Sequence, residues 1–135
     1  MVSREGGIGP EEEDFNKGRL GKDFTKASTL SIAETFHILD QERRKPNFKS
    51  NPIFDQTFEY VTRFNRYPNK EVVKTLRAML EKYKLEDFET SALWNLCPES
   101  PAAAKELIPS LKEKFEGDDE LKELLDELQN ARSLA

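Results

Sequence analysis

The stretch KEVVKTLRAMLEKY, residues 70–83, decides the fold of this chain of 135 residues. Its apolar side chains recur every three or four positions, which places them along one side of an α-helix. They are Val72, Val73, Leu76, Met79, Leu80 and Tyr83. Asn69 comes directly before the stretch, and asparagine is a preferred residue at a helix N-cap. The pattern therefore predicts a helix that buries one face against other helices.

Helical spacing continues on both sides of this stretch. Ser31 and Glu34 have the spacing of a capping box, in which each side chain binds the other residue's backbone N–H, so a helix is predicted from Ser31 to before Pro46. Further helices are predicted over residues 52–65 and 85–96, from 101 onward and after 118. We therefore predict an all-α fold. Its parts are a disordered tail over residues 1–18, a partner-docking arm and first helix over 19–51, and a helical bundle over 52–132.

Charge is divided unevenly along the chain. Residues 41–84 hold eleven Lys or Arg against five Asp or Glu, a balance of 11 − 5 = +6. Residues 85–130 hold four against thirteen, a balance of 4 − 13 = −9. The acidic half is expected to bind nucleic acid poorly because it repels phosphates. Any contact with RNA is expected from the basic middle of the chain, through the candidates Arg63, Arg66, Lys70 and Lys74.

Phe64 decides between two interpretations of that basic segment. Basic and aromatic residues interleave there, a mixture that suits phosphates and stacked bases. The alternative is that Phe64 packs inward with Val61 while the arginines lie at a helix C-terminus, where the helix dipole favours positive charge. The apolar spacing of Phe64 with Val61 favours this alternative.

The sequence predicts no catalytic residue, metal or cofactor. Cys97 and His37 are the only cysteine and histidine, whereas a zinc site needs three or four ligands. Cys97 lies between an apolar helix and Pro98, so it is predicted to be a buried small side chain. A cysteine-dependent enzyme using a Cys97–His37 pair remains a rival. Glu86 and Glu89 share a helix face and are predicted to be solvated.

The sequence also bears on the compartment. A lone cysteine suits a reducing compartment such as the cytosol or nucleus. No apolar run approaches the roughly 20 residues of a membrane helix, so no membrane partner is expected. The first residues lack the apolar stretch of a signal peptide, and secretion is not expected.

An ordered series of motifs resembles the fourth subunit of eukaryotic RNA polymerase II. An aromatic-x-x-Arg-Phe-x-Arg-aromatic segment spans Tyr60 to Tyr67, and Asn-Leu-Cys-Pro-Glu spans Asn95 to Glu99. Ile-Pro-Ser-Leu follows at residues 108–111, and the arm KGRLGKDF, residues 17–24, resembles the family's leucine-glycine-x-x-phenylalanine element. The resemblance covers roughly residues 17–134, and the series is more specific than any one motif.

The resemblance implies an HRDC-like helical bundle preceded by an extended N-terminal arm and one helix. It also implies a non-catalytic role. The family's members pair with the seventh subunit, which carries an OB-fold able to bind RNA, and the pair forms a stalk beside the RNA exit channel that supports initiation and transcript handling. A nuclear location follows, with shuttling to the cytoplasm left open, and no small-molecule substrate is expected. Alternatives are the equivalent subunit of RNA polymerase III or of an archaeal polymerase, or a free HRDC-like nucleic-acid-binding module.

The residues expected to contact the partner lie near the start of the chain. Apolar side chains on an arm without its own core, and on a helix followed by the polar linker 43–51, lack shelter within their own chain. The arm is expected to add as an edge strand to the partner's sheet. The alternative is that these side chains fold back on their own bundle. With Gly21 of the arm motif, the predicted contacts are Leu20, Gly21, Phe24, Leu30, Ile32, Phe36 and Leu39.

Overall fold

The computed structural model describes residues 21, 23 and 27–134, with the side chains of 133 and 134 left out. All regular structure over 27–134 is helical, which confirms the predicted all-α fold. The helices are α1 (Ile32–Arg43), α2 (Pro52–Phe64), α3 (Lys70–Glu81), α4 (Asp87–Leu96), α5 (Pro101–Leu107), α6 (Leu111–Lys114) and α7 (Asp119–Leu134).

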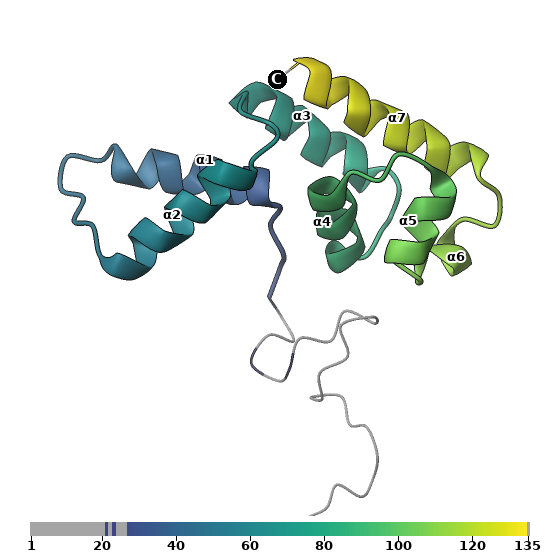
Figure 1. Ribbon diagram of the computed structural model, residues 1–135, viewed down its shortest axis with the longest axis horizontal. Helices are drawn as coiled ribbons and strands as arrows, with labels where there is room; N and C mark the ends of the chain where they lie inside the picture. Colours follow the sequence, from purple (N-terminus) through teal and green to yellow (C-terminus); the bar gives the residue numbers. More distant parts are fainter. Residues whose placement is uncertain (1–20, 22, 24–26, 135) are drawn as a thin grey trace, which may run out of the picture.

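The helices form two groups (Figure 1). Helices α3 to α7 gather into one body, in which α3 packs along α7. Helices α1 and α2 form an antiparallel hairpin that projects from this body. Helix α2 makes its main contacts with α1, and α1 makes the main contacts of the hairpin with α3 and α4. A domain division at residue 51 stays a prediction, and it separates two helices that pack on each other.

Local signals place the helix starts where the sequence predicts them. The Ser31 hydroxyl accepts from Glu34 N, and the Ser31 N–H donates to Glu34 Oε1 at 2.9 Å, which completes the capping box. The side chain of Asn69 accepts from Glu71 N and Val72 N at the start of α3. Ser100 accepts from Ala103 N at the start of α5. Each cap satisfies backbone donors that have no partner within the helix.

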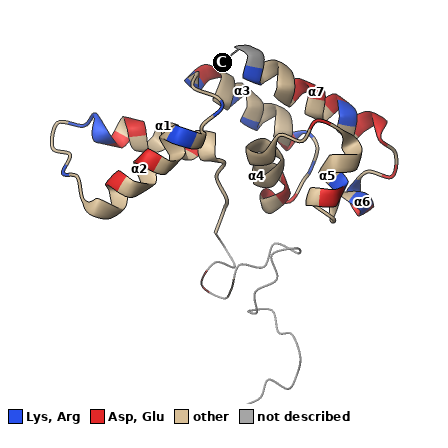
Figure 2. Cartoon of the chain, viewed as in Figure 1, with Lys and Arg blue, Asp and Glu red and all other residues tan. Residues whose placement is uncertain are grey.

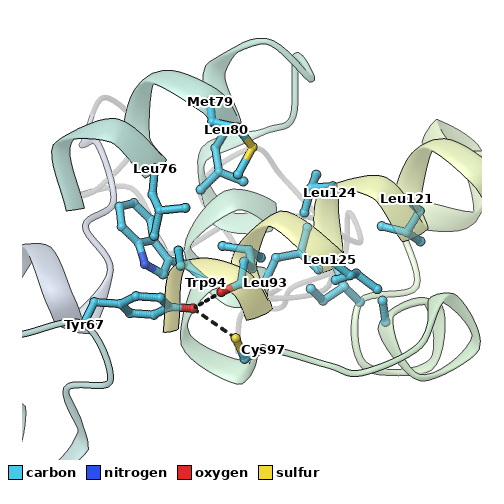
Figure 3. Packing of buried hydrophobic residues seen from close by; sticks show 14 of the residues in the cluster. Tyr67, Leu76, Met79, Leu80, Leu93, Trp94, Cys97, Leu121, Leu124 and Leu125 are labelled. Carbon is cyan, nitrogen blue, oxygen red and sulfur yellow. Dashed lines mark hydrogen bonds between the residues drawn. The ribbon is translucent and has the colours of Figure 1, made fainter. Parts of the chain in front are cut away.

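The core lies between α3, α4 and α7 (Figure 3). The apolar face predicted for α3 is buried, and one face of α7 meets it with four leucines. Trp94 of α4 packs edge-on against Tyr67, with 6.2 Å between ring centroids. Fully burying each large apolar side chain contributes about 1.5–3 kcal/mol. The fully buried leucines of this core are Leu80, Leu93, Leu111, Leu121, Leu124, Leu125 and Leu128.

Cys97 ends α4 and is buried, as predicted. Its φ of 48° places it in the left-handed region at the helix C-cap, and only 5 % of the residue is exposed. The Tyr67 hydroxyl lies 3.0 Å from Cys97 Sγ and also donates to the Leu128 carbonyl at 3.4 Å (Figure 3). Burial and the contact with Cys97 raise the pKa of Tyr67. Cys97 is therefore a core residue at the C-terminal end of α4.

Two side chains of α4 have an exposure opposite to their chemical character. Glu89 is fully buried, so the prediction of a solvated face is wrong for this residue, although Glu86 is exposed. The Ser110 hydroxyl donates to Glu89 Oε2, and Lys114 Nζ lies 3.6 Å from Glu89 Oε1. Both partners come from the α5–α6 region that covers this side of α4. Leu96, although apolar, is exposed at the last turn of α4.

Candidate partner-docking surface

An ion pair fixes α1 to α3. Arg77 Nε and Nη2 donate to Glu34 Oε2 and Oε1 at 2.8 and 2.6 Å. Burial by itself would raise the pKa of Glu34, but the bonds from Arg77 and Ser31 outweigh it and lower that pKa. A bidentate guanidinium–carboxylate pair fixes orientation as well as distance. Glu34, which completes the capping box of α1, thus also sets how α1 lies on α3.

The segment leading into α1 is bound to α4. Thr29 Oγ1 donates to the Asp87 carbonyl at 2.9 Å and lies 2.7 Å from Ser91 Oγ. The Ile32 N–H donates to Asn95 Oδ1 at 2.8 Å. Ala33, in the first turn of α1, belongs to the core cluster. Helix α1 is therefore packed on the bundle rather than held apart by the polar linker, because its first turn carries polar groups that α4 satisfies.

Aromatic rings hold α2 against α1. Phe36 of α1 stacks on Phe58 of α2 with 5.7 Å between ring centroids, and Phe58 lies 6.0 Å from Phe54 in turn. Phe48, in the loop between the helices, adds a tilted contact to Phe54 at 4.8 Å. Arg43 lies over the Phe58 ring at 5.0 Å. These contacts form a small separate cluster within the hairpin, worth about 0.5–1.5 kcal/mol for each ring pair beyond burial.

A groove of about 290 Å³ lies between α1 and α3. Leu30 and Ile38 line it and remain 49 % and 47 % exposed, while the buried Val73 also lines it. Lys70 and Lys74 of α3 supply positive charge at the same groove. Leu30 and Ile38 are thus presented to solvent on elements that the Glu34–Arg77 pair and the α4 contacts hold in place. We call this set the α1–α3 groove.

A second apolar surface follows the outer side of α2. Ile53, Tyr60 and Phe64 recur at spacings of seven and four residues, which aligns them on one side of the helix. Tyr60 and Phe64 contact each other with 4.8 Å between ring centroids. All three are exposed, Ile53 by 78 %. We call this set the α2 stripe.

Comparison with known proteins shows which family this chain belongs to. Residues 13–132 match the family model described as RNA polymerase Rpb4. The chain belongs to the Rpb4 family. This confirms the resemblance found in the sequence motifs.

Named relatives of this Rpb4-family chain agree with the match. DNA-directed RNA polymerase II subunit 4 of Arabidopsis thaliana is 34% identical over 133 residues, covering 93% of this chain and 95% of the relative. Subunit rpb4 of Dictyostelium discoideum is 38% identical over 142 residues, covering 90% of each. RPB4 of Saccharomyces cerevisiae is 36% identical over 85 residues, which is 63% of this chain but only 38% of the yeast protein.

The predicted contacts on the arm fall mostly outside the described residues. Leu20 and Phe24 are not among them. Gly21 is described and has a φ of 101°, a conformation that glycine adopts readily and other residues rarely do. Leu30, at the end of the arm, is exposed in the α1–α3 groove. A role for these residues in partner binding stays a prediction.

The predicted contacts on α1 are partly covered by the chain itself. Ile32, Phe36 and Leu39 are half-buried. Phe36 faces α2 through its stack on Phe58. Ile32 lies beside Trp94 and Asn95 at the junction with α4. Ile32 and Phe36 therefore contact helices of their own chain, as the alternative of folding back on the bundle expects.

Sequence reasoning missed some of the exposed apolar residues of this region. Ile38 falls outside the stripe of Ile32, Phe36 and Leu39, so the spacing argument passed over it. The α2 stripe had a detectable signal, since Ile53 and Tyr60 are seven residues apart on a helix that already had a full apolar face. A helix with two apolar sides has two surfaces to cover, and among the described helices α1 is the main neighbour of α2.

The structure divides the candidate RNA contacts between two places. Arg63 and Arg66 are exposed on either side of Phe64, and Arg63 Nη2 lies 3.8 Å from Glu59 Oε1. Lys70 and Lys74 line the α1–α3 groove instead. Phe64 is 48 % exposed, so the prediction that it packs inward is wrong. Val61 takes the buried position, and Phe64, almost a full turn later, contacts Tyr60.

Neither His37 nor Cys97 belongs to a cluster of metal-binding side chains. Among the described residues, no group of three or more His, Cys, Asp or Glu could hold a metal ion. His37 Nε2 lies 3.0 Å from the Tyr67 carbonyl oxygen, whereas Cys97 contacts the Tyr67 hydroxyl. The two side chains therefore bind opposite ends of one residue. Within the same described part, none of the helices has the length and apolarity needed to cross a membrane.

Proposed function

We propose that this chain is a non-catalytic subunit of nuclear DNA-directed RNA polymerase II. In this proposal it pairs with the seventh subunit and forms the stalk near the RNA exit channel, where it supports initiation and transcript handling. Membership of the Rpb4 family and the names of its relatives support the polymerase assignment. The observation that carries the pairing is the exposure of two apolar side chains, Leu30 just before α1 and Ile38 on it, beside the Glu34–Arg77 pair that fixes α1 to α3.

The α1–α3 groove supports a protein partner on physical grounds. Leu30 and Ile38 each leave about half of their surface in water, and covering each would contribute about 1 kcal/mol. Because Arg77 and Asn95 already fix the elements that carry them, little conformational entropy is lost when a partner binds. The arm residues Leu20, Gly21 and Phe24 would extend this contact, with the arm added to the edge of a sheet in the partner.

The α2 stripe gives the same partner a second contact. It lies on the hairpin that projects from the bundle, so a partner seated on α1 reaches it without disturbing the core (Figure 1). Exposed aromatic side chains such as Tyr60 and Phe64 are enriched at the energetic centres of protein interfaces. The pairing therefore uses the hairpin and the flank of α3 that faces it, and leaves the rest of the α3–α7 body free to extend the stalk.

Co-expression with a seventh subunit tests the pairing. We expect the two chains to co-purify as a 1:1 complex, and Leu30→Asp with Ile38→Asp to abolish co-purification without loss of helical content. Leu107→Asp is the matched control, because Leu107 is equally exposed on α5, away from the hairpin. Leu20→Ala with Phe24→Ala is expected to weaken the pair. A folded, monomeric wild-type chain that fails to co-purify would end the proposal.

A free nucleic-acid-binding module is the second candidate, and the exposure of Phe64 favours it. An exposed ring between Arg63 and Arg66 could stack on a base while the guanidiniums meet phosphates. This candidate expects the isolated chain to bind single-stranded RNA in a salt-dependent manner, with binding lost on Arg63→Glu and Arg66→Glu. Absence of binding by the isolated chain, together with co-purification of the pair, favours the stalk subunit.

A further inference from the structure

A second groove lies on the other side of α3, against α7. It has a volume of about 410 Å³, and Val72, Leu76 and Met79 of α3 line it together with Ala131 of α7. Residues 72, 76 and 79 follow one another at helical spacing along α3, where Leu76 and Met79 form the floor of the groove with 3 % and 7 % of the residue exposed and Val72 is partly exposed. The polar residues at the groove are Glu71, Thr75, Glu127 and Asn130.

The charge at this groove is entirely negative. Glu71 and Glu127 are its charged lining residues, one on each helix. Burial raises the pKa of the Tyr83 phenol, and the α7 carboxylates Glu127, Glu123 and Glu120 raise it further. Acidic positions recur along α7 in Figure 2 and are exposed, and Lys122 of this helix lies 3.5 Å from Asp126. The groove thus combines an apolar floor with acidic edges.

We propose that the α3–α7 groove binds a basic, amphipathic helical segment of a partner protein. Its apolar side chains lie on Val72, Leu76 and Met79, and its lysines or arginines meet Glu71 and Glu127 on the two edges. A groove between two packed helices accepts the apolar stripe of a third helix, with anchors at spacings of three and four residues. Acidic edges on both helices select positive charge in that segment and repel nucleic acid.

This surface is separate from the one assigned to the seventh subunit. The α1–α3 groove uses Val73, Lys74 and Arg77 on one side of α3, and the α3–α7 groove uses Val72, Thr75 and Met79 on the other. Helix α3 lies between them, so both grooves can be occupied together. The inference stands whether or not the chain pairs with a seventh subunit.

Binding of a labelled probe peptide to the full-length chain tests the inference. The probe is a fluorescein-labelled helical peptide of about five turns, with leucines on one side and lysines on the other, and its partner probe has glutamate in place of lysine. We expect the basic peptide to bind, with an affinity that falls as salt is added, and the acidic peptide to show no binding. Fluorescence anisotropy measures both affinities.

Two variants separate groove binding from general attraction to an acidic protein. Thr75→Arg fills the groove, and we expect it to weaken binding by about tenfold or more, because it displaces apolar contacts and adds like charge. Thr57→Arg is the matched control: Thr75 and Thr57 are both exposed, and each donates to the carbonyl of the residue four positions earlier. Glu71→Lys with Glu127→Lys is expected to weaken binding about fivefold to tenfold, whereas Glu106→Lys with Glu116→Lys leaves it nearly unchanged.

These measurements distinguish a basic helical segment in the groove from a second copy of the chain or from general attraction to acidic charge. Loss of binding in Thr75→Arg but not in Thr57→Arg, with unchanged circular dichroism, supports the proposal. Equal binding by both variants shows attraction to acidic charge alone and overturns it. Self-association of the chain that Thr75→Arg abolishes, measured by sedimentation velocity without peptide, would assign the groove to a second copy and also overturn it.

Discussion

Arg77 holds both carboxylate oxygens of Glu34, and this one contact fixes the helix α1 that carries the proposed partner surface. Glu34 also completes the N-cap of its own helix by accepting from Ser31 N. A single carboxylate therefore decides both where α1 starts and how it lies on α3. Arg77 also lies over the ring of Trp94 at 5.6 Å, which connects this pair to the core.

Removing Arg77 should destabilise the bundle. Arg77→Ala leaves the half-buried Glu34 carboxylate without its charged partner, and we expect a loss of about 1–3 kcal/mol in the free energy of unfolding. Arg44→Ala removes a more exposed partner of Asp40 on the same helix, and its loss should stay under about 1 kcal/mol. Urea unfolding followed by circular dichroism measures both. Equal losses would mean that the Glu34–Arg77 pair is not a special contact.

Stability should fall in acid partly through Glu34. The pKa of Glu34 is lowered from its ordinary value of 4.5 in the folded chain. The stabilisation is therefore fully present above 4.5 and is lost as the pH falls through the lowered folded pKa. Glu34→Gln should be less stable than the wild type at neutral pH, and the gap should narrow below pH 4.5. Urea midpoints across this pH range measure the effect, and a constant gap would contradict it.

Cys97 should react slowly in the folded chain. Its thiol is buried and contacts the Tyr67 hydroxyl, so an alkylating reagent must wait for the chain to open. We expect alkylation to accelerate sharply in unfolding concentrations of urea. Mass spectrometry of iodoacetamide adducts over time measures this. Rapid, stoichiometric reaction in native buffer would instead support a cysteine-dependent enzyme.

Glu89 should tolerate substitution worse than its neighbour Glu86. Glu89→Ala removes the acceptor of the Ser110 hydroxyl and of the Glu86 N–H, and we expect a loss of about 1–3 kcal/mol. Glu86→Ala changes an exposed side chain, and we expect a loss of about 0.5 kcal/mol or less. Thermal unfolding measures both. Identical melting temperatures would show that the buried carboxylate contributes nothing to the α4–α6 contact.

The α2 helix should open before the rest of the molecule. It packs mainly on α1 through Phe36, Phe54 and Phe58, whereas α7 lies against the main core. We expect amide hydrogens of α2 to exchange faster than those of α7, and Phe58→Ala to widen the difference. Hydrogen–deuterium exchange with peptide-level mass spectrometry measures this. Uniform protection of both helices would show that the hairpin unfolds only with the bundle.

Sequence reasoning succeeded where local chemistry decides the structure. The Ser31–Glu34 box, the Asn69 cap and the apolar period of α3 each depend on residues within a few positions of one another. The burial of Cys97 followed from its place between an apolar helix and a proline. These features are nearly independent of which helices become neighbours, so a single sequence contains enough information to place them.

Sequence reasoning failed where the neighbour of a helix decides burial. Glu89 has the character of a solvated carboxylate until Ser110 and Lys114, more than twenty residues later, cover it. Phe64 has the spacing of a core residue, but α2 packs on α1 and turns Phe64 outward. Ile38 was not predicted as a contact because the stripe of Ile32, Phe36 and Leu39 already accounted for the helical pattern of α1. Tertiary pairing, which spacing along one helix does not encode, determined all three outcomes.

The two flanks of α3 carry opposite charge, because Lys70 and Lys74 border one groove while Glu71 borders the other. A ligand attracted to the first flank is repelled by the second. The charge on each flank of α3 thus selects which ligand binds on that side of the molecule. In an assembly built around α3, the adjacent residues Lys70 and Glu71 would therefore favour partners of opposite charge on the two flanks.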